Sequence, residues 1–133
     1  MYVHFVWTTW DREPLITPLV EPRIYSAIAA KCHELGCQPI EIGGVEDHVH
    51  VLVRLSATVS IAQLAHGIKG SSSHLATHAL NVPFKWRGSY GAFSVGRSEV
   101  TRIRKYIRNQ KEHHAKRELV AEWERDEEPR PGK

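Results

Sequence analysis

The sequence has little cysteine and no long apolar stretch. Its 133 residues include two cysteines, Cys32 and Cys37, too few for the disulfide framework of a small secreted protein. We expect both thiols to be reduced and partly buried, because a zinc site would need more ligands than the neighbouring His33. No apolar run approaches the roughly 18 residues of a membrane span, and the N-terminal residues read as a strand rather than a secretory leader. These absences favour a cytoplasmic protein without a membrane partner.

Length and composition predict one globular domain. Apolar residues make up 41% of the chain and charged residues 25%, which is ordinary for a folded protein of this size. The sequence contains no internal repeat and no linker. We therefore predict a single domain over residues 1–128 and a loose tail over residues 129–133.

Charge is distributed unevenly along the chain. The net charge is only +3, yet residues 97–117 hold eight basic and two acidic side chains. A basic helix of this kind attracts a polyanion such as a nucleic acid backbone. The alternative is an ordinary solvated helix face, which charge alone does not exclude.

Hydrophobic periodicity and turn residues predict alternating strands and helices. Pro22 suits the first turn of a helix that Gly36 would end, and Ser60 with Gln63 resembles a capping box for a second helix. Gly67, Gly70 and the serines at 71–73 predict a break or a kink in the middle of that second helix. The predicted strands cover residues 2–10, 37–45, 49–55 and 84–95, the last with a bulge, and the predicted helices cover residues 22–35, 60–80, 99–114 and 116–127.

This order of elements is typical of one fold. A β-α-β-β-α-β succession followed by helices predicts the ferredoxin-like (RRM-like) α+β arrangement, an antiparallel sheet with two helices on one face. The other face, or an edge, is then available for the C-terminal helix that carries Tyr106, for a partner or for nucleic acid.

Two short motifs carry the candidate chemistry. On a strand, His48 and His50 would project to the same side while Val49 packs into the core, and two neutral imidazoles form half of a site for a divalent cation. On a helix, Tyr106 and Gln110 would share one face. A phenol with a pKa of about 10 is a poor nucleophile unless a cation polarises the phosphate that it attacks. The alternatives are hydrogen-bonded structural histidines and an amphipathic helix whose tyrosine packs in the core.

The same motifs carry a resemblance to a known family. His48-Val49-His50 matches the signature of HUH endonucleases, and residues 106–114 resemble the tyrosine helix of single-tyrosine HUH transposases of bacterial and archaeal insertion sequences (the IS200-like transposases). Residues 68–72 and 90–95 also resemble segments of that family. The resemblance implies that His48, His50 and Gln110 hold Mg²⁺ or Mn²⁺, and that Tyr106 attacks a DNA phosphate to form a 5′-phosphotyrosine.

The resemblance also implies partners. Family members act as homodimers, in which the tyrosine helix of one subunit can complete the histidine pair of the other, on single-stranded DNA with hairpins in the nucleoid. Two rivals stay open: a domesticated nickase acting on repeat hairpins, and a non-catalytic nucleic-acid-binding module. Six basic residues are candidate DNA contacts, with plain surface charge as the alternative: Arg54, Lys69, Lys85, Arg87, Arg102 and Lys105. We expect the four tryptophans to be core or interface residues more often than base-stacking platforms.

Overall fold

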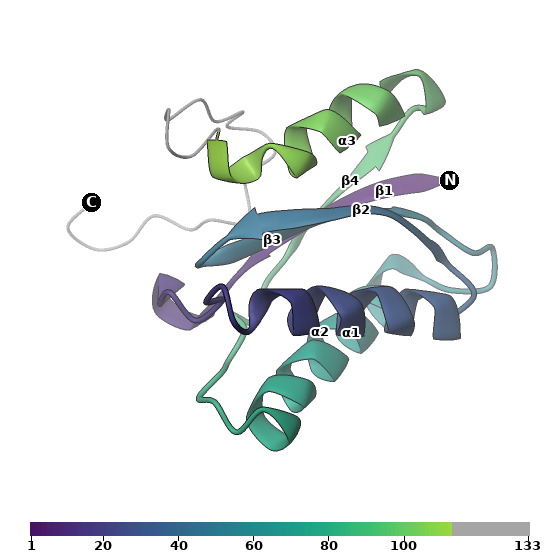
Figure 1. Ribbon diagram of the computed structural model, residues 1–133. Coiled ribbons are helices and arrows are strands. Elements are labelled where there is room, and N and C mark those ends of the chain that lie inside the picture. Colours follow the sequence, from purple (N-terminus) through teal and green to yellow (C-terminus); the bar gives the residue numbers. More distant parts are fainter. Residues whose placement is uncertain (113–133) are drawn as a thin grey trace.

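A four-stranded antiparallel sheet forms the centre of the molecule, with helices on both of its faces (Figure 1). The computed structural model describes residues 1–112, so the helix expected over residues 116–127 and the tail over residues 129–133 lie outside the described residues. The strand order is β2-β3-β1-β4, which confirms the predicted ferredoxin-like α+β fold. The elements are β1 (Tyr2–Thr8), α1 (Glu21–Glu34), β2 (Gln38–Val45), β3 (His48–Arg54), α2 (Ile61–His74), β4 (Gly91–Val95) and α3 (Val100–Arg108).

Alternation along the two central strands decides what each face of the sheet carries. Apolar side chains of β1 and β3 form the main core with α1 and α2; they are Val3, Phe5, Trp7, Val49, Val51 and Val53. The intervening positions point to the opposite face, which α3 covers (Figure 1). There Leu52 and Val95 pack against Ile103, Tyr106 and Ile107 in a second, smaller cluster.

Two helix boundaries predicted from the sequence are confirmed, the end of α1 and the start of α2. Gly36 has a φ of +78° just after α1, a left-handed conformation that glycine adopts without strain. The Ser60–Gln63 capping box forms at the start of α2. The helix is not broken at Gly67, Gly70 or the following serines, because α2 continues to His74; a π-helical turn over Leu75–Ala79 follows it. A Cβ atom on Gly67 would meet Leu35 at 3.1 Å, so this glycine lets α2 pack closely on the end of α1.

The last strand is shorter than predicted. β4 begins at Gly91, whereas the segment before it makes only an isolated bridge between Thr9 and Trp86. Trp86 pairs with Thr9, and Gly91 pairs with Val6. Trp86 and Gly91 are five positions apart in the sequence, whereas Thr9 and Val6 are only three apart. The extra residues bulge out, as the sequence predicted, and they interrupt the ladder.

The two cysteines are buried, and neither takes part in a disulfide. Burial, reinforced by the neighbouring Cys37, raises the pKa of the Cys32 thiol to about 12. A protonated, inaccessible thiol is chemically inert. Within residues 1–112, no helix combines the length and apolar character that crossing a membrane requires.

Candidate active site

Helix α3 brings Tyr106 and Gln110 against the two histidines of β3. The helix is strongly amphipathic, so it lays Ile103, Tyr106 and Ile107 on the sheet and turns its basic residues outward. It ends at Arg108, and the following turn places Gln110 over β3. The side chains of Tyr106 and Gln110 are 6% and 1% exposed, and both histidines are fully buried.

The four candidate residues meet within a single chain. Nε2 of His48 lies 3.2 Å from Oε1 of Gln110. The rings of His50 and Tyr106 meet edge to face with their centroids 5.7 Å apart, and the two histidine rings are 5.2 Å apart. The histidine pair and the Tyr106–Gln110 pair, both predicted from their spacing in the sequence, therefore lie together under α3.

Asp47 and Arg12 fix the orientation of His48. Oδ1 of Asp47 lies 2.9 Å from Nδ1 of His48, and Nε of Arg12 donates to Oδ2 of the same carboxylate at 3.1 Å. Burial would raise the pKa of Asp47, but hydrogen bonds from His48 and Arg12, together with the positive charge of Arg12, outweigh burial and hold that pKa well below its usual range. The carboxylate is therefore ionised at neutral pH and selects the tautomer of His48 that donates from Nδ1.

His4 orients His50 as Asp47 orients His48. It is fully buried on β1, and its Nε2 lies 2.9 Å from Nδ1 of His50. His4 was not predicted from the sequence, although a histidine among the apolar residues of a buried strand indicates a hydrogen-bonded or functional side chain. Because Asp47 and His4 both engage an Nδ1 atom, His48 and His50 both have Nε2 as the atom for a ligand.

The donor set fits a divalent cation. Each ring nitrogen of His48 faces an oxygen: Nδ1 faces Asp47 and Nε2 faces Gln110. A neutral imidazole carries one proton, so it can donate to only one of these two oxygens. A cation between Nε2 and Oε1 would satisfy both atoms, and 3.2 Å is close to the roughly 3 Å between adjacent ligands of an octahedral Mg²⁺. Within the described residues no three His, Cys, Asp or Glu side chains form a metal-binding group, so such a site needs the amide of Gln110.

Gly43 allows α3 to approach the sheet closely. A Cβ atom there would overlap the backbone carbonyl oxygen of Ile107, the residue after Tyr106. Ion pairs add to this contact, since Glu41 on β2 pairs with Arg104 at 3.4 Å and with Arg108 at 3.1 Å. The role of this glycine was not predicted from the sequence, although a glycine within a strand is a known sign of close backbone approach.

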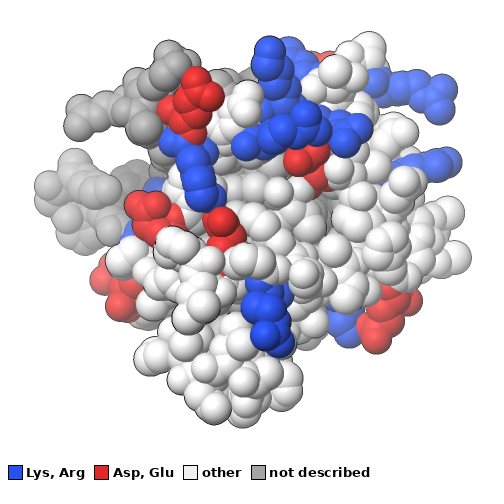
Figure 2. Space-filling model, in the orientation of Figure 1, with Lys and Arg blue, Asp and Glu red and all other residues white. Residues whose placement is uncertain are grey.

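The predicted DNA contacts are divided between two sides of the sheet. Arg102 and Lys105 are exposed on α3, where lysine and arginine side chains gather at the top of the molecule (Figure 2). Lys69 and Arg87 lie on the other side, and Arg54 is exposed at the end of β3. The ammonium of Lys69 donates to the backbone oxygens of Arg87 and Ser89 at 2.6 and 3.1 Å, so it holds the bulge before β4.

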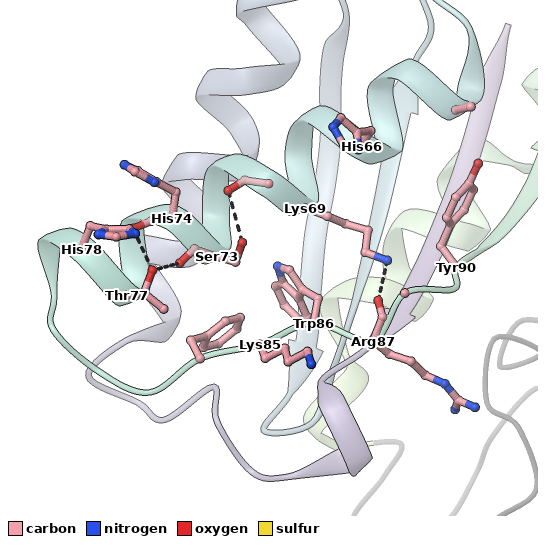
Figure 3. A pocket seen from close by; sticks show the side chains of 14 residues that line it. His66, Lys69, Ser73, His74, Thr77, His78, Lys85, Trp86, Arg87 and Tyr90 are labelled. Atoms are coloured by element: carbon pink, nitrogen blue, oxygen red, sulfur yellow. Dashed lines mark hydrogen bonds between the residues drawn. The ribbon is translucent and has the colours of Figure 1, made fainter.

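A groove of about 860 Å³ follows α2 on this second side. Aromatic rings and basic side chains line it, as Figure 3 shows, and they include Lys69, Lys85, Trp86 and Tyr90. The side chain of Arg87 extends away from α2 in the same view. The molecule therefore presents basic groups both around α3 and beside α2.

Comparisons with known proteins identify the family and the fold. No protein of curated function matches the chain. Two solved structures share the fold with a TM-score of 0.67 each. One, a candidate transposase from Deinococcus radiodurans R1, is 22% identical and matches 83% of this chain and 90% of its own. The other, a REP-associated tyrosine transposase bound to a REP hairpin, is 13% identical and matches 85% of this chain and 67% of its own. The family model described as "Transposase IS200 like" matches residues 1–110, and the chain therefore belongs to the IS200-like transposase family.

Proposed function

We propose that this protein cleaves and rejoins single-stranded DNA through Tyr106, with Mg²⁺ or Mn²⁺ held by His48, His50 and Gln110. The observation that carries the proposal is the meeting of these four side chains in one buried cluster. Family membership supports a role in DNA processing. A purely structural helix would not require a phenol and an amide to face two imidazoles at the interface with the sheet.

The reaction exchanges one phosphodiester for another. The phenolic oxygen of Tyr106 forms a bond to the phosphorus and loses its proton, while the bond from phosphorus to the 3′ oxygen breaks and that oxygen takes up a proton. The products are a 5′-phosphotyrosine and a free 3′ hydroxyl. Rejoining is the reverse attack by a 3′ hydroxyl, so bond energy is retained and no nucleotide cofactor is needed.

The residues around the site prepare it for this step. A bound divalent cation supplies positive charge to the phosphate oxygens as negative charge develops on them. Asp47 and His4 engage the Nδ1 atoms of the two histidines and leave both Nε2 atoms for a ligand, and Ile103 with Ile107 keeps the tyrosine helix on the sheet. Rigid support of this kind lowers the cost of positioning the reacting groups.

We further propose that the DNA contacts both basic regions, with the single strand near α3 and a hairpin stem beside α2. The groove along α2 combines cations with aromatic faces, which suits nucleic acid. One protein of the same fold was solved with a REP hairpin. This division would use Arg102 and Lys105 on one side and Lys69 and Arg87 on the other, with Arg54 exposed at the end of β3.

We also propose that the protein acts as a homodimer on nucleoid DNA. The four candidate side chains already meet within one chain, so a dimer is not required to assemble them. Its use would be to hold two DNA ends together for strand exchange. Light scattering with and without hairpin DNA measures the stoichiometry, and a monomer under both conditions would refute the dimer.

The proposed chemistry is tested by trapping the intermediate. Labelled single strands with hairpins, taken from the DNA that flanks the gene, are incubated with the protein and Mn²⁺ and resolved on a denaturing gel. A covalent adduct, with the label mapped by mass spectrometry to the peptide containing Tyr106, is the expected result, and chelation by EDTA should prevent it. Tight binding of several hairpins without any adduct would instead favour the non-catalytic binding module.

Replacing Asp47 by alanine should weaken Mn²⁺ binding. The change removes the carboxylate that orients His48, and loss of such an outer partner typically costs about 10- to 100-fold in metal affinity. Calorimetric titration with Mn²⁺ measures the effect without DNA. Glu46→Ala is the matched control, because Glu46 is the neighbouring acidic residue and is exposed. Equal affinities for Mn²⁺ in the two variants would contradict the assignment.

A further inference from the structure

Trp10 differs from the other two tryptophans within residues 1–112 in being exposed at the surface. Trp7 and Trp86 are 0% and 7% exposed and pack edge to face in the main core. Trp10, by contrast, is 48% exposed in the turn that follows β1. Exposing an aromatic ring of this size to water is unfavourable unless the ring meets a partner.

The turn that carries Trp10 is attached to the candidate active site. The backbone NH of Thr9 donates to the carbonyl oxygen of Asp47 at 2.9 Å, and Arg12 donates to the Asp47 carboxylate at 3.1 Å. Asp47 in turn contacts His48. Trp10 thus lies between Thr9 and Arg12. Both of these residues contact Asp47, which is next to the candidate metal ligand His48.

A cation is held over the ring of Trp10. The ammonium of Lys85 lies 4.0 Å from the ring centroid, and the NH of Trp10 donates to the carbonyl oxygen of Lys85 at 2.9 Å. Lys85 is exposed, whereas Phe84 and Trp86 on either side of it turn into the core. Two segments far apart in sequence therefore hold an aromatic face and a positive charge together at the surface.

The turn itself is restrained. Asp11 and Arg12 both have φ values of 51°, a left-handed conformation that residues other than glycine rarely adopt. The hydroxyl of Thr9 donates to the backbone oxygen of Glu13 at 2.6 Å, closing the turn. Trp10 is thus presented on a fixed base, which reduces the ordering cost when a ligand binds.

We propose that Trp10, with Lys85, stacks on a base of the single-stranded DNA close to the phosphate that is cleaved. Proteins that bind single strands without sequence preference combine aromatic faces for the bases with cations for the backbone. Trp10 and Lys85 present both next to the Asp47–His48 corner. The inference rests on single-stranded DNA being the substrate, as proposed above, and adds the residue that positions the strand.

The test compares two replacements of Trp10 in the full chain carrying Tyr106→Phe, so that DNA is bound and not cut. Trp10→Leu keeps an apolar side chain but loses the ring, and Trp10→Phe keeps a ring. Fluorescence anisotropy with oligothymidylate should show affinity about 5- to 100-fold lower for Trp10→Leu, with most of it kept by Trp10→Phe. Leu19→Ala is the matched control, because Leu19 is 85% exposed and should bind normally.

An abasic strand of the same length separates stacking from charge. It keeps the phosphates and loses the bases, so the affinities of the parent and Trp10→Leu should become equal on it. Unchanged binding of oligothymidylate by Trp10→Leu, or the same loss on the abasic strand, would overturn the inference. The measurement needs no cleavage: a clear effect of Trp10 on binding, together with no adduct from the protein that keeps Tyr106, would leave the stacking intact and refute the Tyr106 chemistry.

Discussion

Replacing Tyr106 by phenylalanine should abolish the covalent DNA adduct, lowering its rate of formation by roughly 10³-fold or more. The change removes only the nucleophilic oxygen, while the ring keeps its contacts with His50 and with the cluster around Leu52. The measurement is the fraction of labelled strand retained at the protein on a denaturing gel with Mn²⁺. DNA binding should stay close to that of the parent, and the free energy of unfolding should change by no more than about 1.5 kcal/mol.

Tyr25→Phe provides the matched control for this loss. Burial, together with the charge and hydrogen bond of Glu21, raises the pKa of Tyr25, so its phenol is a poor nucleophile. It also lies on α1, on the face of the sheet opposite α3 (Figure 1). Tyr25→Phe should therefore form the adduct normally. An adduct formed by the Tyr106→Phe variant would show that another group is the nucleophile.

Much of the fold could be predicted because its signals are local. Alternating residues on β1 and β3 divide core side chains from those under α3, and the Ser60–Gln63 capping box marks the start of α2. The candidate site was predictable for the same reason. A spacing of two on a strand puts both histidines on one face, and the turn after α3 brings Gln110 to the side that carries Tyr106, so the two pairs meet.

What could not be predicted depends on pairing between distant segments. His4 stands opposite Leu52 in the register and reaches His50 diagonally, so its role follows only from the alignment of β1 with β3. Arg12 reaches Asp47 through a left-handed turn that its sequence, without glycine, does not indicate. The shortened β4 likewise reflects a change of register around the bulge before it, which no local pattern of hydrophobicity encodes.

Gly43→Ala should reduce adduct formation strongly while leaving the sheet folded. The added Cβ atom would overlap the carbonyl oxygen of Ile107, and backbone at a helix–sheet contact has little room to move aside. Overpacking of this kind costs about 1–3 kcal/mol in the free energy of unfolding. Relief requires α3 to shift outward, which carries Tyr106 and Gln110 away from the histidines, and a displacement near 1 Å can lower a rate by about 10²-fold.

Gly96→Ala is the control for the chemical change itself. Gly96 has a φ of −72°, and the nearest atom to an added Cβ, Oε1 of Glu99, is 3.9 Å away. Since alanine fits there, this variant should gain up to about 1 kcal/mol in stability through the unfolded chain and keep its activity. Thermal unfolding and the adduct assay are run on both proteins. Normal adduct formation by Gly43→Ala would show that the close approach of α3 to β2 is not what holds Tyr106 and Gln110 at the two histidines.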